Sequence, residues 1–326
     1  MKKILKAVSP FIHPGFLNFK MMPYEAWKRN GGEVAKVHYP WRWFHGAAYR
    51  WELPTIWKCR KEARLRFVEP VSLKFDSFPD YARYEVVPMF WDCWPRYFDM
   101  TCEWLRCHQV KTAIFSSRMT AERMQERLPE MRIIWCPEAV DGAVYQKGKK
   151  LKDRTIDLLE FGRSNEKVLA AGALEKAFES SHGADGMNFS LNHVCTKRNG
   201  KFIYTNEQLY QAMGDAKVTI ALPRCMTQPE MAGDIETLTQ RYWECMFSRM
   251  VMVGHAPKEL VDLIGYNPVI ELREDISAEA LIRDVLEHIE EYQELVDKNR
   301  ETAERLGSWD VRLKWLMEEL KEEYEV

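Results

Sequence analysis

The fold is decided by the stretch Asp234-Ile-Glu-Thr-Leu-Thr-Gln-Arg-Tyr-Trp-Glu-Cys-Met-Phe-Ser-Arg-Met-Val-Met-Val-Gly254. Two carboxylates, Glu236 and Glu244, lie at the start of this stretch and within the helix that it predicts over about 238–248. A short, wholly apolar run follows directly at 250–253 and predicts a buried strand. A helix that leads straight into a buried strand is typical of an α/β protein with a parallel sheet.

The same alternation of strands and helices continues on both sides of this stretch. Toward the C-terminus it predicts a helix from 257, a strand at 269–272 and then helical segments to the end. Toward the N-terminus it predicts strands at 156–161 and 217–222, with a helix at 207–214 whose Thr205 and Gln208 have capping-box spacing. The first half predicts strands at 1–8, 33–39, 84–91, 112–117 and 132–135, and helices at 19–29, 95–108 and 120–128.

The chain is long enough for two domains, because 326 residues exceed what one hydrophobic core usually serves. The polar and basic segment between Asp141 and Asp153, which contains two glycines, is typical of an exposed linker. We therefore expect a boundary at 147/148, with one Rossmann-like parallel-sheet domain on each side.

Composition excludes several classes of function. With 47 Lys and Arg against 49 Asp and Glu, the chain is less basic than a general nucleic-acid binder, so no nucleic-acid partner is expected. The sequence contains no uncharged apolar run long enough to predict a membrane span. Lys6, Pro10 and Pro14 interrupt any secretory signal, so a cytoplasmic protein is expected. The eight cysteines and eight histidines show no spacing typical of metal ligands, so no metal site is expected.

Ligands of parallel sheets bind beyond the carboxyl ends of the strands, so the strand exits hold the candidate site residues. In the second half, Arg163 and Lys167 follow the strand at 156–161 at the start of an expected helix. Two cations and helix N-terminal amides suit a diphosphate. Ordinary solvated charges at a helix start are an equally good interpretation.

The stretch from Asp234 to Gly254 resembles the donor-site segment of GT-B-fold nucleotide-sugar glycosyltransferases, in particular retaining members with a Glu-x7-Glu pattern. The resemblance implies that Glu244 hydrogen-bonds the ribose of the nucleotide and that Glu236 contacts the sugar. The sequence departs from the pattern at 245–248, where Cys-Met-Phe-Ser replaces the usual small residues. It also departs at Arg249, which replaces a glycine, and no glycine-rich loop follows Glu236.

The resemblance extends more weakly along most of the chain. Phe161-Gly-Arg-Ser-Asn-Glu-Lys167 looks like the family's pyrophosphate clamp, although Lys167 comes one residue early, and the likeness implies that Arg163 and Lys167 bind the diphosphate. We expect Arg241 to assist them. The segment at 308–312 looks like the start of the final helix that crosses back to the first domain, so 306–326 is expected to pack there. The implied fold is GT-B, with two Rossmann-like domains facing across a cleft: an acceptor-side domain at 1–147 and a donor-binding domain at 148–305.

Candidates in the first half also lie at strand exits. Asp92 follows the strand at 84–91 and is a candidate to orient the acceptor hydroxyl or to act as its base; a helix cap before Pro95 is the alternative. His13 is a second catalytic candidate, although a structural or acceptor-contacting role fits it equally. Gly15 is a candidate for a close backbone approach to the donor phosphate, or a plain turn glycine.

The segment Tyr39 to Phe67 mixes tryptophans with basic residues, which suits a wall for saccharide stacking or a contact with anionic lipid. We expect Trp41, Trp43 and His45 to lie on the acceptor side. The alternative is a set of core tryptophans beside a solvated basic helix.

These observations predict a metal-independent glycosyltransferase of the hexosyltransferase type, with a nucleotide sugar as co-substrate and no cofactor. The expected acceptor is a saccharide or a lipid-linked molecule, in bacterial surface polysaccharide or glycoconjugate synthesis, with peripheral contact at the inner membrane face. Two alternatives remain open: a nucleotide-sugar epimerase or hydrolase with the same fold, and a non-catalytic protein that binds nucleotide sugars.

Overall fold

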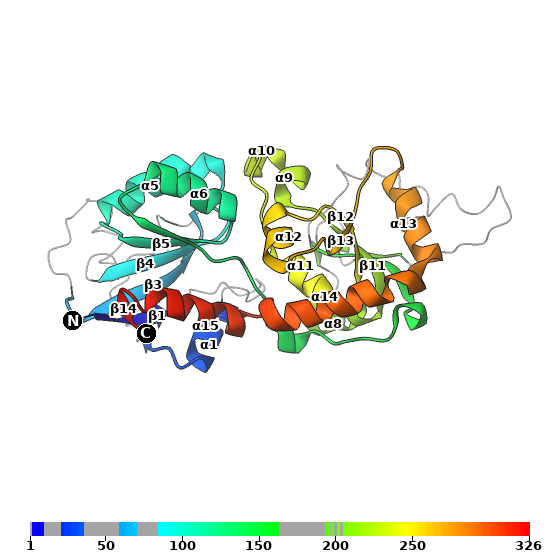
Figure 1. The fold of residues 1–326 in the computed structure, drawn as a ribbon, viewed down its shortest axis with the longest axis horizontal. Coiled ribbons are helices and arrows are strands. Elements are labelled where there is room, and N and C mark those ends of the chain that lie inside the picture. The colour runs from blue at the N-terminus through cyan, green and yellow to red at the C-terminus, as the bar shows by residue number, and fades with distance from the viewer. Residues whose placement is uncertain are drawn as a thin grey trace. The chain divides into compact units, whose positions relative to one another are not determined.

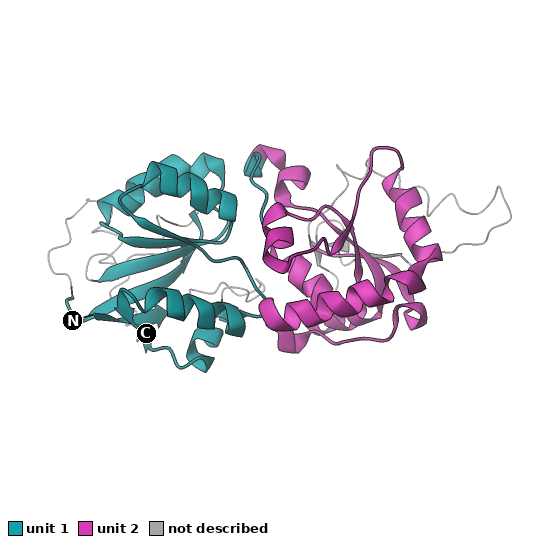
Figure 2. Ribbon diagram, viewed as in Figure 1, with its two compact units in different colours: residues 1–140, 231–237, 308–326 teal, residues 141–230, 238–307 magenta. Residues whose placement is uncertain are grey.

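A computed structural model describes residues 2–9, 21–35, 59–70, 73, 84–162 and 205–326, and strand backbone at 193–195, 197–198 and 201–202. The chain divides into two compact units (Figure 2). Unit 1 contains Met1–Val140, Met231–Thr237 and Ser308–Val326, and unit 2 contains Asp141–Glu230 and Leu238–Gly307.

Unit 1 is built on a parallel sheet in the order β14-β1-β3-β4-β5-β6, with β2 paired to β1. The strands are β1 Lys3–Val8, β2 Val34–Ala35, β3 Glu62–Val68, β4 Glu85–Phe90, β5 Thr112–Phe115, β6 Arg132–Trp135 and β14 Tyr324–Glu325. Because every pair is parallel, the carboxyl ends of these strands meet at one edge of the sheet.

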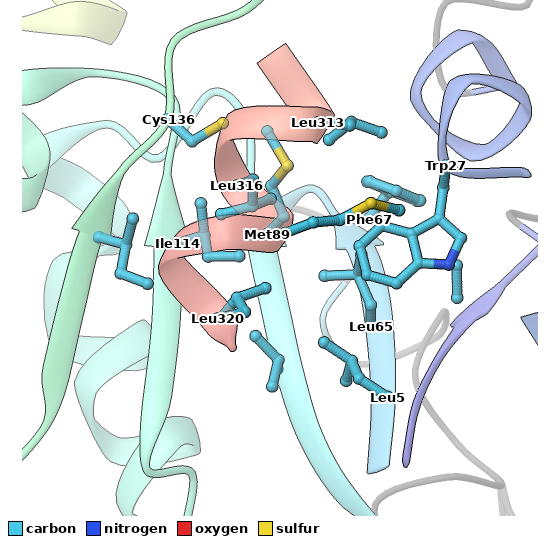
Figure 3. Packing of buried hydrophobic residues seen from close by; sticks show 14 of the residues in the cluster. Leu5, Trp27, Leu65, Phe67, Met89, Ile114, Cys136, Leu313, Leu316 and Leu320 are labelled. Carbon is cyan, nitrogen blue, oxygen red and sulfur yellow. The ribbon is translucent and has the colours of Figure 1, made fainter. Parts of the chain in front are cut away.

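Helices cover both faces of this sheet (Figure 1). On one face, α1 (Met21–Arg29) and α15 (Trp309–Leu320) contribute Trp27, Leu313 and Leu316 to the core that they share with the strands (Figure 3). On the other face, a 3-10 turn, η3 (Pro95–Tyr97), leads into α5 (Phe98–Cys107), and α6 (Arg118–Arg127) lies beside α5. This three-layer arrangement explains why β4 and β5 are apolar on both faces over most of their length.

The C-terminal part of the segment from Tyr39 to Phe67 has a structure that neither interpretation of its sequence predicts. Residues 62–68 are neither a basic helix nor an exposed wall: they form β3, a central strand between β1 and β4. The alternation of Arg64 and Arg66 with apolar residues has the period of a strand, but the two charges made the segment look exposed, and both arginines are buried. The Arg64 guanidinium is paired with Glu62 at 2.9 Å and lies 3.7 Å from the centre of the Tyr84 ring.

Unit 2 contains a second parallel sheet, in the order β13-β12-β11-β7-β8. Its strands are β7 Ile156–Glu160, β8 His193–Cys195, β11 Ala216–Ala221, β12 Val251–Gly254 and β13 Val269–Glu271, with β9 Lys197–Arg198 and β10 Lys201–Phe202 forming a separate antiparallel pair. The helices are α8 Asn206–Asp215, α9 Arg224–Thr227, α10 Pro229–Ala232, α11 Gln240–Phe247, α12 Lys258–Ile264, α13 Ala278–Glu287 and α14 Gln293–Leu306.

The unit 2 core forms where α13 packs on this sheet. Leu281, Ile282 and Val285 of α13 are buried against Val218 and Val251 of the strands. The segment expected as a linker forms the 3-10 turns η4 (Gly142–Val144) and η5 (Leu151–Asp153), and a third such turn, η6 (Ile289–Tyr292), precedes α14. The expected helix through 168–178 lies outside the described residues. Within the described part of the chain, no helix is long and apolar enough to cross a membrane.

The C-terminal segment returns to unit 1, as the sequence resemblance implied. Ser308 forms a bridge with Val140, and the Trp309 amide donates to the Val140 carbonyl at 2.9 Å. Trp309 is fully buried, and its ring lies 6.1 Å from that of Trp91. The chain therefore leaves unit 1 and comes back to it at neighbouring points.

A buried carboxylate holds both chain ends in the sheet. Glu85 of β4 accepts from the Tyr324 hydroxyl of β14 at 2.8 Å and is paired with Lys3 of β1 at 2.5 Å. Burial alone would raise the pKa of Glu85, but the hydrogen bonds from Lys3 and Tyr324 and the charge of Lys111 lower it below its ordinary value of 4.5. The charged form is thus favoured by folding.

We expect Glu85→Gln to lower the free energy of unfolding at neutral pH by about 2 kcal/mol, since it removes the charged partner of these bonds. Because folding lowers this pKa, the contribution is complete above the unfolded value and disappears as pH falls through the folded value. Urea denaturation at decreasing pH should show the two proteins converging. A stability difference that persists at acidic pH would contradict the role of the charge.

Candidate functional site

The first turn of α11 lies at the carboxyl edge of the unit 2 sheet. The Arg241 guanidinium donates from Nη2 to the Phe161 carbonyl, just beyond β7, at 2.7 Å. The Tyr242 hydroxyl donates to the His255 carbonyl, just beyond β12, at 2.7 Å. The start of the helix is fixed from a third direction, because the buried Glu259 carboxylate accepts from the Leu238 amide. The N-terminus of α11 is therefore held over the strand exits where parallel sheets bind ligands.

Arg241 packs against the turn that follows β7. The guanidinium lies 5.2 Å from the centre of the Phe161 ring, and Gly162 adopts a positive φ of 79°. A Cβ on Gly162 would lie 2.2 Å from Nη2 of Arg241, so only glycine leaves room for this contact. Within the described residues, the guanidinium donates through Nη2, to the Phe161 carbonyl. The other N–H groups of the guanidinium are available to an anion.

Glu244 lies one turn further along α11 in an apolar, aromatic environment. Its Oε1 accepts from the Tyr145 hydroxyl at 3.1 Å. The Tyr145 ring stacks on Phe247 with centres 6.0 Å apart and meets the edge of Tyr210 at 5.1 Å. Desolvation raises the pKa of Glu244, and the Tyr145 hydrogen bond and the charge of Arg241 only partly oppose it. A carboxylate in such a site gains from further hydrogen-bond donors, such as ribose hydroxyls.

Tyr145 is a site residue that sequence reasoning missed. It is buried, and desolvation and the neighbouring Glu244 raise its pKa well above the ordinary value. The Arg300 guanidinium donates to its carbonyl at 3.1 Å and also to the carbonyl of Phe247, so α14 holds Tyr145 and the end of α11 together. The sequence carried no signal for it, because it lies in the polar segment interpreted as a linker.

Arg249, which replaces the family's glycine, has the backbone of a glycine. Its φ is 55°, and the Met250 amide bonds the Cys245 carbonyl at 3.1 Å while the Arg249 amide bonds the Met246 carbonyl at 3.2 Å. These two bonds define a Schellman motif, whose left-handed residue is most often glycine. The Arg249 side chain is buried and paired with Asp297 at 2.5 Å. The departure from the pattern thus changes the side chain but preserves the helix end.

Glu236 lies in the segment 231–237, which packs with unit 1 although it was expected within the range 148–305. Asp234 forms a two-bond ion pair with Arg123 at 2.8 and 2.5 Å, and the Ser117 hydroxyl donates to the Glu236 carbonyl at 3.2 Å. The sequence pattern gives no warning of this, because it spans both units without a break. Arg241 and Glu244 are brought together in unit 2, and Glu236 is described with unit 1.

Asp92 lies at the carboxyl edge of the unit 1 sheet, directly after β4. Its φ is 52° and its side chain is exposed. It does not cap the turn at Pro95, whose N-cap is Trp94 with no side-chain hydrogen bond, so the alternative of a helix cap is wrong. Asp92, Ser116 and Thr237 line a cavity of about 10 Å³, room for about one water molecule. The buried Thr237 hydroxyl has no hydrogen-bond partner among the described residues.

The remaining predicted site residues lie outside the described residues: His13, Gly15, Trp41, Trp43, His45, Arg163 and Lys167. Their expected roles stay predictions. Among the residues that are described, no group of three or more His, Cys, Asp and Glu side chains could hold a metal ion.

Comparisons with known proteins bear on the fold. No protein-family model matches the sequence, and no curated protein matches it. A glycosyltransferase from Rickettsia africae matches with a TM-score of 0.54 and 10% identity, over 98% of both chains. AviGT4, a glycosyltransferase involved in avilamycin A biosynthesis, matches with a TM-score of 0.54 and 14% identity, over 98% of this chain and 97% of its own.

The chain has the GT-B fold. Sucrose-phosphate synthase from Thermosynechococcus elongatus also matches, with a TM-score of 0.54 and 10% identity, over 95% of this chain and 80% of its own. In this GT-B chain, unit 2 carries Arg241 and Glu244 at the carboxyl edge of its sheet, and unit 1 carries Asp92 at the corresponding edge. Identities this low establish the fold only.

The strained helix end is tested by comparing two substitutions. Arg249→Ala and Arg249→Gly both remove the ion pair with Asp297, but only alanine keeps the cost of a positive φ. We expect the glycine variant to be more stable than the alanine variant by about 1 kcal/mol, measured by urea denaturation.

Glu301, an exposed residue within α14, provides the matched control. There glycine should be less stable than alanine by about 1 kcal/mol, because the backbone is helical. The same order of stability at both positions would show that Arg249 carries no backbone strain.

Proposed function

We propose that this protein is a glycosyltransferase of the hexosyltransferase type that takes its sugar from a nucleotide-sugar donor without a metal ion. One observation carries the proposal: Arg241 and Glu244 lie on the same helix, whose N-terminus is bonded to the strand exits of the unit 2 sheet in a GT-B fold. A cation and a partly desolvated carboxylate at such an edge match the diphosphate and the ribose of one nucleotide.

In the proposed mechanism, the leaving group is a nucleoside diphosphate. The Arg241 guanidinium, together with Arg163 and Lys167, stabilises the negative charge that develops on the diphosphate as the glycosidic bond breaks. The N-terminus of α11 adds to this field, since a helix N-terminus attracts anions. These groups would perform the role that a metal ion performs elsewhere.

Glu244 selects the nucleotide in this proposal. Its desolvated carboxylate already accepts one hydrogen bond from Tyr145, and the ribose hydroxyls would donate to its other oxygen. A buried acceptor that is left unsatisfied without its ligand discriminates strongly against compounds that lack those hydroxyls.

The acceptor is proposed to bind at unit 1, where Asp92 would orient its hydroxyl or remove its proton. A saccharide or lipid-linked acceptor, bacterial surface polysaccharide synthesis and peripheral membrane contact remain proposals. They rest on the aromatic and basic residues at 39–58, among them Trp41 and Trp43.

The first test is thermal unfolding of the purified protein with nucleoside diphosphates and nucleotide sugars, with and without EDTA. A ligand that binds only the folded state raises the melting temperature, by an amount equivalent to about 2.7 kcal/mol at a hundredfold excess over its Kd. We expect one diphosphate to raise it regardless of EDTA. No shift with any of these ligands would contradict donor binding and leave a non-catalytic protein.

Turnover then separates the enzymatic alternatives. Incubation of the stabilising nucleotide sugar with saccharide acceptors should give a glycosylated product. Release of free sugar, or conversion to an epimer, without any acceptor would replace the transferase proposal with the hydrolase or epimerase.

Glu244→Gln should weaken binding of that diphosphate about tenfold, because a charged hydrogen bond to the ribose becomes a neutral one. It should not lower the melting temperature. Folding raises the pKa of Glu244, so its charge opposes folding at neutral pH and this cost disappears only as pH falls. Calorimetric titration and thermal unfolding measure the two effects.

The control is Glu287→Gln, at an exposed position on α13, which should change neither quantity. Below neutral pH, wild-type affinity should decline as Glu244 becomes protonated, and the Glu244→Gln variant should lack this component. An unchanged affinity in Glu244→Gln would remove this residue from the nucleotide site.

A further inference from the structure

A surface groove in unit 1 lies between α6 and the edge strand β6. Its volume is about 490 Å³, which falls within the range of small-molecule binding sites. Ala121, Ile133 and Trp135 form an apolar floor, and Arg118, Glu122 and Glu126 surround it. Because β6 is the last strand in the described sheet order, the groove is at the edge of the sheet.

The walls of this groove are fixed in place by Gln125. Its Nε2 donates to the carbonyls of Leu128 and Met131 at 3.2 and 3.0 Å, and its Oε1 accepts from the Ile133 amide at 3.3 Å. These bonds join the end of α6 to the outer strand. The groove is therefore a rigid surface and does not need a ligand to form.

Trp135 is the aromatic surface of the groove. It is half-buried, and the Arg118 guanidinium lies 5.5 Å from the centre of its ring. This cation–π contact limits the movement of the indole. The Nε1 group has no hydrogen-bond acceptor among the described residues. A large rigid ring of this kind offers contact area at a low cost in conformational entropy.

Two carboxylates on α6 complete the groove. Glu122 and Glu126 are exposed, four positions apart, and neither makes a hydrogen bond or an ion pair within the described part of the chain. Like charges at this spacing destabilise a helix slightly, by about 0.2–0.5 kcal/mol, so helix stability does not account for the pair. Carboxylates accept hydrogen bonds only, and so they suit a ligand that is rich in hydroxyl donors.

The chemistry of the groove selects one class of occupant. An anionic ligand would be repelled by the two carboxylates, and a purely apolar one would leave them without partners. A neutral saccharide has C–H faces that pack on an indole and hydroxyls that donate to carboxylates. A basic peptide is the alternative that also matches the charge, and the salt dependence of binding distinguishes it from a saccharide.

The groove also continues from the proposed acceptor site along the chain. Ser117, which lines the cavity beside Asp92, directly precedes Arg118, and Glu138, which lines the same cavity, follows Trp135 by three residues. Both walls of the groove thus begin at the carboxyl edge of the unit 1 sheet. The cavity beside Asp92 and the groove are therefore lined by residues that are neighbours in the sequence at two places.

We propose that the groove between α6 and β6 binds a neutral saccharide chain and holds the part of the acceptor remote from the reacting hydroxyl. This inference rests on the proposed function, because it treats the acceptor as a saccharide. Trp135 packs against a sugar ring, and Glu122 and Glu126 accept from its hydroxyls. The acceptor is then recognised over several sugar units.

The test applies the full-length protein, without donor, to an array of immobilised neutral di- to octasaccharides. The saccharides are ranked by how strongly they retain the protein. We expect Trp135→Ala to weaken the strongest binding about tenfold. Trp315→Ala, which removes an exposed tryptophan on α15, is the control and should have no effect. The double variant Glu122→Gln with Glu126→Gln changes only exposed side chains, so it keeps the test valid if Trp135→Ala fails to fold, and it should weaken binding about fivefold.

Salt separates the two possible occupants. Saccharide binding should be unchanged in high salt, whereas an exposed charge contact with a basic peptide would weaken. The proposal is overturned if no saccharide on the array retains the protein, if Trp135→Ala binds as well as Trp315→Ala, or if a parallel array of immobilised basic peptides retains the protein and the saccharides do not. Diphosphate binding to unit 2 is measured separately. Its loss would refute the proposed function, and its presence without saccharide binding would refute only this inference.

Discussion

Parallel pairing is the constraint on which both units depend, because it brings every strand exit to one edge of its sheet. In unit 2, Glu271, the last residue of β13, is bonded to the His255 ring at 2.8 Å and to the Ala256 amide at 3.0 Å, both just beyond β12. Gly254 allows β12 this close to β11: a Cβ there would lie 1.9 Å from the Ala221 carbonyl oxygen. Since α11 is bonded to two of these exits, the position of Arg241 depends on the register of the strands beneath it.

Unit 1 depends on residues that are distant in sequence. Without α15, the face of the sheet that includes Leu65 and Met89 would lose the helix that supplies Leu313, Leu316 and Leu320 (Figure 3). Without β14, the buried Glu85 carboxylate would lose the hydrogen bond that it accepts from the Tyr324 hydroxyl. Burial of several large side chains by one helix contributes several kcal/mol, so unit 1 and the C-terminal segment are expected to fold together. The polar network then specifies which strand lies beside β1.

The sequence predicted the fold through its periodicity, and it predicted the site only in part. Apolar runs such as 217–222 and 250–253 fall on β11 and β12, because a buried parallel strand has few alternatives. It failed at β3, where Arg64 and Arg66 are buried and Arg64 is paired with Glu62, because only the tertiary structure shows this burial. It could not identify Tyr145, whose importance comes from burial beside Glu244, nor group Glu236 with unit 1. Spacing along the chain records neighbours on a helix but not which unit a loop packs on.

Three of the described non-glycine residues, Asp92, Gln109 and Arg249, have a left-handed φ of the kind that favours glycine, and they differ in what offsets the strain. Arg249 is compensated locally: its guanidinium is buried and paired with Asp297, and the helix end gains two capping bonds. Asp92 and Gln109 have a similar left-handed φ, but their side chains are exposed. Among these three residues, Arg249 is therefore the one whose side chain is buried, and its ion pair and the capping bonds keep in place the end of the helix that carries Arg241 and Glu244.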